Sequence, residues 1–418
     1  MTDQRSTVLG LRANWEQFVL LVVVNAFVGG MVGLERSILP LLAKDEFGIT
    51  STAAAVSFIS TFGLAKALTN LFSGHMAGRF SRKSLLVTGW LFGLPVPFVL
   101  MFAPSWGWIV GANLLLGVNQ GLTWSMTVNM KVDLVGPRQR GLALGFNEAA
   151  GYMSVAAAAY LSGVIAQHYG LRPEPFYLGI GFSAAGLALS TLFVRDTSRF
   201  VALEATHHGE VRRASFATTF AEASWRKPQL WGVSQAGFVN NLNDGLIWGI
   251  FPLFFASSGL GLGRIAVLAA VYPLLWGSLQ LITGVMSDRL GRQPLIVAGM
   301  LLQGGAILLV TVSDAYALWV VAVGLIGIGT AMVYPTLLAA IIDVVHPAQR
   351  SSALGVYRFW RDGGAIAGAL VGGVLADAFG FSTAIRFVGL LTLASGFVAD
   401  RALRAGAAAA SRSSEVVR

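Results

Sequence analysis

The chain has 418 residues, of which 55% are hydrophobic and only 12% are charged, and it contains no cysteine. A soluble globular protein carries about 25% charged residues, so this composition indicates a membrane protein. The net charge is +9 at pH 7, but the basic residues are spread from loop to loop and are not gathered on one soluble face, which excludes nucleic-acid binding. The lack of cysteine excludes disulfides and thiolate metal sites.

Apolar runs close to the ~20 residues that a helix needs to cross a bilayer recur along the whole chain. Because hydrocarbon cannot satisfy backbone polar groups, and because the runs are too long for barrel strands, each run predicts a helix. The twelve predicted helices lie near residues 17–39, 53–73, 84–103, 107–129, 141–166, 175–194, 230–255, 265–284, 294–312, 316–342, 353–376 and 382–400. The predicted fold class is an all-α polytopic membrane protein.

The loops between these helices predict the orientation. If the N-terminus is cytoplasmic, the cytoplasmic segments hold 21 of the 29 Lys and Arg residues, Lys131 among them, and the opposite loops hold three. Basic residues are retained on the cytoplasmic side, so this asymmetry predicts that both termini are cytoplasmic. We expect a multi-pass protein of a bacterial inner membrane.

The chain contains an internal repeat. DLVGPRQRGLALG, from Asp133 to Gly145, recurs 210 residues later as DVVHPAQRSSALG, from Asp343 to Gly355. A repeat of this length predicts two copies of one unit, and doubled membrane halves are a common architecture of transporters. The predicted domains are a six-helix bundle, a cytoplasmic linker with a short amphipathic helix, a second six-helix bundle and a disordered tail: 1–194, 195–228, 229–404 and 405–418.

A loop motif then identifies a family. Gly74 to Lys83 reads GHMAGRFSRK, and Gly284 to Gln293 reads GVMSDRLGRQ. Both segments resemble the G-x-x-x-D-R-x-G-R-K signature of the major facilitator superfamily, which lies between the second and third helices of each half. The resemblance implies a conformational latch in which the Asp faces a helix terminus and the arginines bridge to the other half. Its expected members are Gly74, Arg79, Arg82, Gly284, Asp288, Arg289, Gly291 and Arg292.

The chain departs from this family in several motifs. The first copy has Gly78 at the acidic position and Ser81 at the second glycine, so Asp288 is expected to contribute more of the latch. Proton-driven drug exporters of the superfamily carry R-x-x-Q-G on helix 4, where this chain has Gly117-Val-Asn-Gln-Gly. Helix 5 also lacks the G-P-x-x-G-G antiporter motif. The proton pathway of those exporters therefore cannot be transferred to this chain.

Ionisable residues inside the predicted helices are the remaining candidates. Each would cost roughly 2.5–3.5 kcal/mol at the bilayer centre, so they must face one another or a wet cavity. They are Glu35, Arg36, Lys66, Glu148, Asp244, Arg358, Arg361, Asp362 and Arg386. Arg358 and Asp362 stand four residues apart and are expected to pair, which leaves Arg361 for a ligand or another helix.

Repeat symmetry adds a second expectation. Glu148 and Arg358 occupy matching positions and are predicted to meet across the cavity in one conformation. A carboxyl whose cationic partner moves away in each cycle can load and release a proton. Glu148 and Asp244 are the predicted proton carriers, against the alternative of static ion pairs. Glu35 and Arg36 are expected to form a gate or interface pair.

The substrate is predicted only by class. The nine intramembrane groups sum to +1, which favours an anionic or zwitterionic solute over an organic cation. Asn240 and Asn243 supply amides suited to a polar solute, although such amides also join helices at about 0.6 kcal/mol each. We expect no metal and no cofactor, and we expect a monomer.

The predicted function is secondary transport of a small solute by alternating access, with proton-coupled export first and proton-coupled uptake of an anionic metabolite as the alternative. No phosphate-binding loop is present, which disfavours direct use of ATP. A membrane-embedded enzyme would need a cluster of nucleophile or metal ligands, and the five histidines lie in or beside loops on different sides. A transport-inactive sensor is disfavoured by the intact set of charges.

Overall fold

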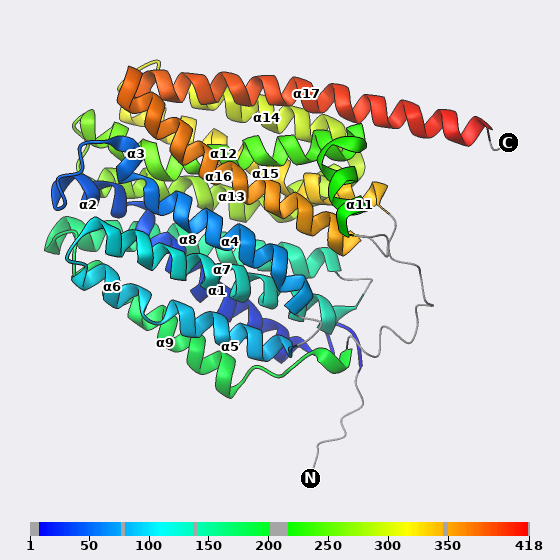
Figure 1. Ribbon diagram of the computed structural model, residues 1–418, viewed down its shortest axis with the longest axis horizontal. Coiled ribbons are helices and arrows are strands. Elements are labelled where there is room, and N and C mark those ends of the chain that lie inside the picture. The colour runs from blue at the N-terminus through cyan, green and yellow to red at the C-terminus, as the bar shows by residue number, and fades with distance from the viewer. Residues whose placement is uncertain (1–7, 77–79, 137–139, 201–215, 346–349, 417–418) are drawn as a thin grey trace, which may run out of the picture.

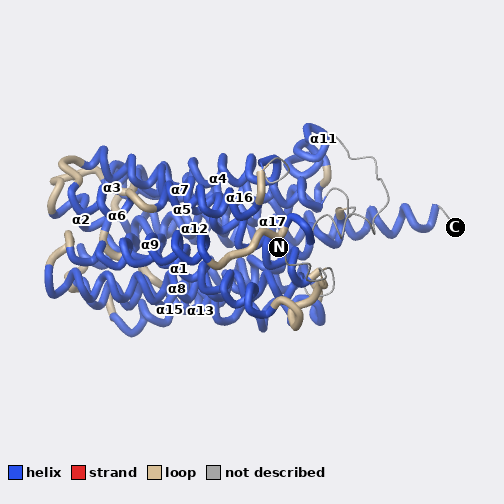
Figure 2. Tube along the Cα trace, turned by 90° about the horizontal axis from the view of Figure 1, so that it is seen from below, coloured by secondary structure: helices blue, strands red, loops and turns tan. Residues whose placement is uncertain are grey.

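The computed structural model describes residues 8–76, 80–136, 140–200, 216–345 and 350–416. Within these ranges the chain is helical and contains no strand. Long helices run back and forth through one bundle, and the start of α1 and the end of α17 lie at the same end of it (Figure 1; Figure 2). We call this end the terminal end and the opposite one the distal end.

The first half is built from six successive spanning elements in the described residues, four of which consist of two segments. In chain order the segments are α1 (Trp15–Arg36) with α2 (Leu39–Asp45), α3 (Thr52–Ala55) with α4 (Ser57–Met76), α5 (Arg82–Gly93) with α6 (Val96–Phe102), α7 (Trp106–Val135), α8 (Arg140–Tyr169), and the 3-10 turn η2 (Glu174–Phe176) with α9 (Tyr177–Leu192). Pro40 opens α2, and Pro95 and Pro97 lie at the start of α6. Proline lacks a backbone N–H, so these positions favour a break between helices.

The second half repeats the pattern. Its segments are the linker helix α11 (Phe216–Ala221) with the π turn η3 (Glu222–Arg226), then α12 (Pro228–Ser257), α13 (Leu262–Leu290), α14 (Arg292–Leu309), α15 (Tyr316–Val344), α16 (Arg350–Phe379) and α17 (Phe381–Val416). Each of the twelve predicted runs coincides with one spanning element, so the predicted fold class is confirmed. The disordered tail expected from residue 405 is not what the structure shows: α17 continues to Val416, because its alanine-rich end has high helix propensity.

Three of the spanning helices bury polar side chains toward the protein interior. Nine elements of the described chain are long and apolar enough to cross a bilayer. The other three, α4, α7 and α12, are at least 20 residues long but are less apolar. α12, for example, buries Asn240, Asn241, Asn243 and Asp244. Polar groups on membrane helices turn toward protein or water, so these three helices surround the interior where a site is expected.

Glycines bring helices of the same half into backbone contact. On α16, a Cβ atom at Gly364 or Gly368 would lie 2.0 Å from a backbone oxygen of α12. On α1, a Cβ atom at Gly29 would lie 2.2 Å from the backbone oxygen of Gly151 on α8. The pairs α1/α8 and α12/α16 are related by the repeat, so small residues fix the same contact in both halves.

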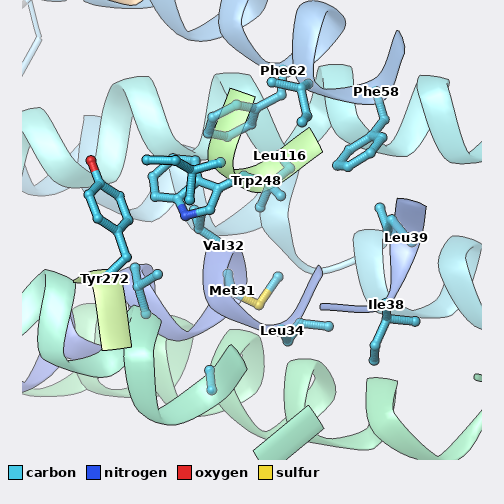
Figure 3. Close-up of a cluster of buried hydrophobic side chains, with 14 of the residues drawn as sticks. Met31, Val32, Leu34, Ile38, Leu39, Phe58, Phe62, Leu116, Trp248 and Tyr272 are labelled. Carbon is cyan, nitrogen blue, oxygen red and sulfur yellow. The ribbon is translucent and has the colours of Figure 1, made fainter. Parts of the chain in front are cut away.

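A continuous apolar core joins the two halves. Leu34 of α1, Phe58 of α4 and Trp248 of α12 belong to one buried cluster (Figure 3). The members come from both halves, so the two halves are packed against each other through this cluster.

Gly368→Ala should lower the thermal unfolding temperature, because even a methyl group would meet the backbone oxygen of Leu242. Overpacking of this kind costs about 1–3 kcal/mol. Gly355→Ala on the same helix is the control, since a Cβ atom there meets nothing within 4 Å and alanine is favoured over glycine in a helix by about 1 kcal/mol. Thermal unfolding in detergent compares the two, and equal melting temperatures would contradict the packing argument.

Candidate functional site

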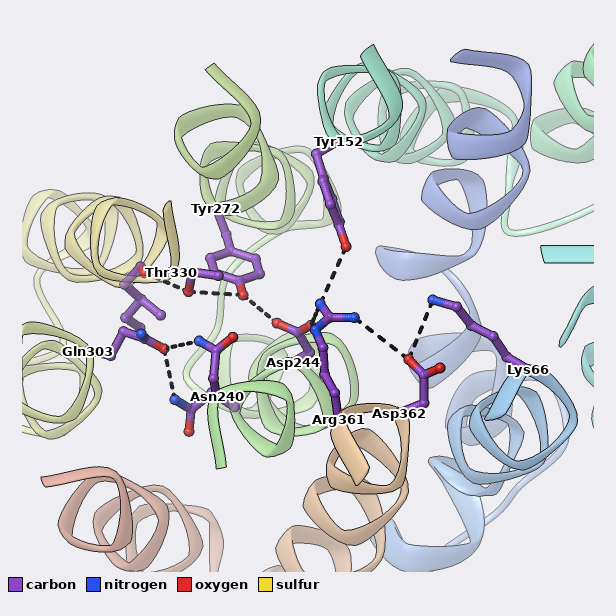
Figure 4. Close-up of polar contacts among 11 residues, drawn as sticks. Lys66, Tyr152, Asn240, Asp244, Tyr272, Gln303, Thr330, Arg361 and Asp362 are labelled. Carbon is purple, nitrogen blue, oxygen red and sulfur yellow. Dashed lines mark hydrogen bonds and ion pairs between the residues drawn. The ribbon is translucent and has the colours of Figure 1, made fainter. Parts of the chain in front are cut away.

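Four charged side chains meet inside the bundle and form what we call the central cluster: Lys66, Asp244, Arg361 and Asp362 (Figure 4). Lys66 Nζ lies 3.9 Å from Asp362 Oδ1, and Arg361 Nη2 lies 3.9 Å from Asp244 Oδ2. Arg361 Nη1 also lies 3.6 Å from Asp362 Oδ1. Lys66 stands on α4 of the first half and the others on α12 and α16 of the second, so the cluster crosses the boundary between the halves.

Asp244 is held from within its own half. The hydroxyl of Tyr272 on α13 donates to Asp244 Oδ1. The same hydroxyl lies 3.3 Å from Thr330 Oγ1 on α15. These contacts fix the carboxylate on the three helices α12, α13 and α15, with one face left toward Arg361.

Asp362 is instead held from the opposite half. Asn70 Nδ2 on α4 donates to Asp362 Oδ2 at 2.8 Å, and the hydroxyl of Ser125 on α7 donates to Asn70 Oδ1 at 2.9 Å. Asp362 therefore receives Lys66 and Asn70 from the first half and Arg361 from its own helix. A movement of the halves past each other must break this set of contacts.

Aromatic rings enclose the cations of the central cluster. The Arg361 guanidinium lies 4.3 Å from the ring centroid of Tyr334, and Arg361 Nη2 donates to the Tyr152 hydroxyl at 3.5 Å. The Tyr152 ring stacks on Trp276 with centroids 3.6 Å apart. Trp276 and Tyr152 occupy the repeat positions of Lys66 and Asp362, so one contact between the halves is ionic and its repeat counterpart is aromatic.

Glu35 and Arg36 are completely buried near the distal side of the cluster. The Arg36 guanidinium lies 4.4 Å from the ring centroid of Trp248 on α12 and 5.2 Å from that of Phe62 on α4. Among the described residues, Arg36 Nε and Nη1 and both Glu35 carboxylate oxygens have no hydrogen-bond partner. Arg36 thus lies at the boundary between halves, as expected of an interface residue, with donors available to a further group.

Glu148 belongs to a separate polar network in the first half. Its Oε1 accepts hydrogen bonds from Trp124 Nε1 at 3.0 Å and from Asn147 Nδ2 at 3.2 Å. Its Oε2 is buried and has no partner in the described part of the chain. The network extends to Asn25, whose Nδ2 donates to the backbone oxygen of Asn147 at 2.7 Å.

Lys131 does not lie in a loop, contrary to the prediction from the sequence. It was assigned to a cytoplasmic loop, but it is fully buried in α7, where Nζ donates to the backbone oxygen of Leu21 at 3.2 Å. The assignment failed because the helix continues to Val135, beyond the apolar run that predicted it.

The pairings expected for Arg358 are not those the structure shows. Asp362 pairs with Lys66 and Arg361, and in the described residues no ion pair joins Arg358 to Asp362 or to Glu148. The spacing along one helix could not reveal that α4 brings Lys66 against the same carboxylate. Arg361, which was expected to be available to a ligand or to another helix, contacts Asp244 on α12 and also Asp362.

The asparagines of α12 also differ from expectation. Asn240 Nδ2 and Asn243 Nδ2 both donate to Gln303 Oε1 on α14, at 2.9 and 3.0 Å. Asn243 Oδ1 accepts from Thr392 on α17 at 2.8 Å. In this structure their amides are occupied in joining helices of the second half.

The loop motif forms ion pairs within each half. Arg82 pairs with Asp133, with Nη2 3.3 Å from Oδ1, and Arg292 Nε lies 2.9 Å from Asp343 Oδ2. Arg82 and Arg292 were expected to bridge to the other half, and these contacts correct that expectation. The aspartates open the two repeated sequence segments, so their constant spacing of 51 residues from the arginines was a signal that could have identified them.

The other motif positions have different roles. Asp288 pairs with Arg292 at the join between α13 and α14. Gly291 lies at that join with φ +92°, a conformation that favours glycine. Gly74 lies in the last turns of α4, Gly284 and Arg289 lie in the last turns of α13, and Arg79 lies outside the described residues.

Asp196, after α9, anchors the start of α5. Its Oδ2 accepts from the backbone N–H of Lys83 at 3.1 Å, and its Oδ1 accepts from that of Ser198 at 2.9 Å. Partial burial alone would raise the pKa of Asp196, but the hydrogen bonds outweigh burial and hold the pKa below its usual value. The carboxylate therefore stays ionised at neutral pH.

A contact that the sequence did not predict closes the distal end. Asp377, near the end of α16, accepts from the Ser51 hydroxyl at 2.7 Å and from the backbone N–H groups of Thr52 and Ala53 at 2.5 and 3.1 Å. It thereby caps the first turn of α3 from the opposite half, where a carboxylate is electrostatically favoured. We call this contact the distal clasp.

The arrangement suits reversible binding of protons or charged solutes. No group of three or more His, Asp or Glu side chains within the described ranges is placed to hold a metal ion. The central cluster offers buried charges that exchange partners when the halves move, a property used for binding protons or charged solutes.

Comparison with known proteins agrees with this architecture. The family model of the Major Facilitator Superfamily matches residues 18–236 and 233–416. The chain is 24% identical over 410 residues to the Multidrug resistance protein MdtG of Enterobacter lignolyticus (strain SCF1), which covers 94% of this chain and 93% of that protein. It is 25% identical over 376 residues to the Uncharacterized MFS-type transporter YddS of Bacillus subtilis (strain 168), covering 86% and 84%.

Two solved structures show the same fold. A POT family transporter in complex with a thioalcohol conjugated peptide superposes with a TM-score of 0.73 at 14% identity, covering 92% of this chain and 95% of that one. A bacterial homolog of the human lysosomal transporter Spinster, in an inward-facing and unoccupied conformation, superposes with a TM-score of 0.72 at 14% identity, covering 94% and 98%.

Arg82→Gln should destabilise the protein more than the repeat-related Arg292→Gln. The side chains of Arg82 and Asp133 are 15% and 10% exposed, against 25% and 51% for Arg292 and Asp343. Loss of Arg82 removes the cationic partner of a largely buried carboxylate, which is more costly than loss of a partner from an exposed pair, because exposed pairs contribute about 0–1 kcal/mol. Thermal unfolding of both variants measures the difference. A larger loss for Arg292→Gln would refute this ranking.

Asp377→Ala should loosen the distal clasp, because α3 loses a charged hydrogen-bond acceptor worth about 1.5–3 kcal/mol. The chain has no native cysteine, so a single cysteine at Ala53 reports on the contact through its rate of labelling by a membrane-impermeant maleimide. We expect labelling to quicken several-fold. Asp314→Ala, an exposed aspartate at the same end, is the control, and an unchanged rate in Asp377→Ala would count against the clasp.

Proposed function

Because the chain belongs to the major facilitator superfamily and is therefore a multi-pass membrane transporter and not an enzyme, we propose that it exports a small anionic or zwitterionic solute in exchange for protons. The two halves rock about the central cluster, and the solute site is exposed to one side of the membrane at a time. The observation that carries this proposal is the ionic contact between Lys66 and Asp362 across the boundary between the halves.

Asp244 is the first proton-binding group of the proposed cycle. When Asp244 is ionised, it pairs with Arg361; when it takes up a proton, the attraction is lost and Arg361 is left with Asp362 and the ring of Tyr334. Arg361 then has donors for an anionic solute. Binding of a proton and binding of the solute are thereby linked through one guanidinium group.

Glu148 is the second proton-binding group. It lies in the same half as Trp124 and Asn147, which bond to only one of its two oxygens. A protonated Oε2 would be an available hydrogen-bond donor on the first half. Arg358, the predicted partner of Glu148 on the second half, forms no ion pair with it among the described residues.

The preference for negative charge rests on unmet donors. Arg36 Nε, Arg36 Nη1 and Arg361 Nε are buried and lack hydrogen-bond partners in the described structure. A carboxylate or phosphate group supplies acceptors matched to guanidinium donors. The rings of Trp248, Trp276 and Tyr152 lie beside these groups and suit a solute with an apolar part.

Direction and orientation follow from two further observations. Relatives at 23–24% identity are named as multidrug resistance proteins, which supports export. The excess of Lys and Arg at the terminal end supports cytoplasmic termini in a bacterial inner membrane. In this orientation the distal clasp closes the extracytoplasmic side.

Asp244→Asn and Glu148→Gln should each reduce the exchange of protons for solute by at least tenfold, and Asp244→Asn should also lower the melting temperature, because Arg361 then keeps only Asp362 as a carboxylate partner. Ligands are first found by a thermal-shift screen of acidic, basic and neutral solutes. Inside-out vesicles with an acidic lumen are then mixed with each ligand, and the loss of the pH gradient is followed by fluorescence. Only exchange releases protons when the solute is added outside, so the assay separates export from uptake coupled to proton entry.

Asp45→Asn, at an exposed distal position, is the matched control and should retain full exchange. Full activity in both Asp244→Asn and Glu148→Gln would exclude them as proton carriers. Stabilisation by organic cations alone would exclude the proposed substrate class.

A further inference from the structure

A groove on the outer surface of the first half lies far from the central cluster. Its volume is about 630 Å³, and it is lined by residues of α8 and α9 and by Phe27 of α1. Ile165, Leu178 and Phe182 form its apolar walls. Gly181 lines the groove, and a Cβ atom there would meet nothing within 4 Å. Because glycine has no side chain, this position leaves the groove open.

One carboxylate stands at the distal mouth of this groove. Glu174, in η2, lines the groove, and its Oε2 is buried without a hydrogen-bond partner among the described residues. The nearby Arg172 does not neutralise it, because that guanidinium pairs with Glu46 and donates to the backbone oxygen of Ala103 at 2.8 Å. Among the described residues, Glu174 Oε2 therefore has neither a cation nor a hydrogen-bond donor.

The dimensions of the groove match one leaflet of a bilayer. Glu174 and Phe182 are eight residues apart, which is about 12 Å along a helix, and half of the hydrocarbon core is about 15 Å thick. The hydroxyl groups of Tyr169 and Tyr177 lie at the same end as Glu174, on side chains that are 71% and 54% exposed. Polar groups thus stand at headgroup level and apolar walls at acyl-chain level.

We propose that this groove binds a phospholipid with a primary ammonium headgroup, such as phosphatidylethanolamine, from the leaflet at the distal end. The ammonium donates a hydrogen bond to Glu174 Oε2, the tyrosine hydroxyls face the phosphate, and one acyl chain lies along the apolar walls. An anionic headgroup would be repelled by the carboxylate. A trimethylammonium headgroup carries the charge but has no N–H to donate, so it satisfies the oxygen less well.

Native mass spectrometry of the purified protein tests this site. The protein is equilibrated with equal amounts of phosphatidylethanolamine, phosphatidylcholine and phosphatidylglycerol, and the retained lipids are counted. We expect the wild type to retain phosphatidylethanolamine several-fold over the other two. Glu174→Gln should reduce this preference to near parity, because the amide oxygen is a weaker partner for an ammonium group.

Gly181→Trp fills the groove and should remove the retained lipid altogether. Its matched control is Gly111→Trp, at an equally open glycine that lines another surface hollow of about 420 Å³ with no acidic residue. Unchanged preference in Glu174→Gln, or equal lipid loss in the two tryptophan variants, would overturn the proposal, since the lipid would then be part of the general annulus. Melting temperatures confirm that each variant is folded, and the readout is independent of transport.

Discussion

The structure depends on one electrostatic constraint: charges inside a membrane protein must find partners, and here the partners belong to opposite halves of the chain. Lys66 and Asp362 lie on opposite halves, and Asn70 adds a second contact from the first half. Separation of α4 from α16 would leave Lys66 without its carboxylate partner, while Asp362 would keep only Arg361, and loss of one partner from a buried pair is destabilising. Water, a proton or a solute must replace the lost partner. The ion pair therefore links the conformation of the halves to the occupancy of the site.

The two ends of the bundle use charge differently. At the terminal end, Arg82–Asp133 and Arg292–Asp343 each tie helices of a single half, and glycine contacts join α1 to α8 and α12 to α16 within the halves. At the distal end, Asp377 contacts α3 across the boundary. Ion pairs at the terminal end thus tie helices within each half, while at the distal end a carboxylate of one half caps a helix of the other.

Much of the fold could be predicted from the sequence, because apolar runs and a 210-residue repeat report directly on spanning helices and their doubling. The charged members of the site were also predicted, since an ionisable residue in an apolar run is conspicuous. Their partners were not. Whether Asp362 meets Arg358 or Lys66, and whether Asn243 faces a solute or Gln303, depends on how helices are rotated and which neighbour they pack against. Lys131 and Asp377 were missed because the apolar runs define helix ends poorly.

The repeat makes the asymmetry of the site interpretable. Symmetry pairs α4 and α16 with α13 and α8, so the contact between Lys66 and Asp362 has a counterpart between Trp276 and Tyr152. The first contact is ionic and changes strength when a proton binds. The second is an aromatic stack, which is insensitive to protonation near neutral pH and contributes about 0.5–1.5 kcal/mol beyond its buried area. The contact between Lys66 and Asp362 is therefore sensitive to protons and charged solutes, whereas the contact between Trp276 and Tyr152 is not. Divergence of two like halves at these positions is sufficient to produce this difference.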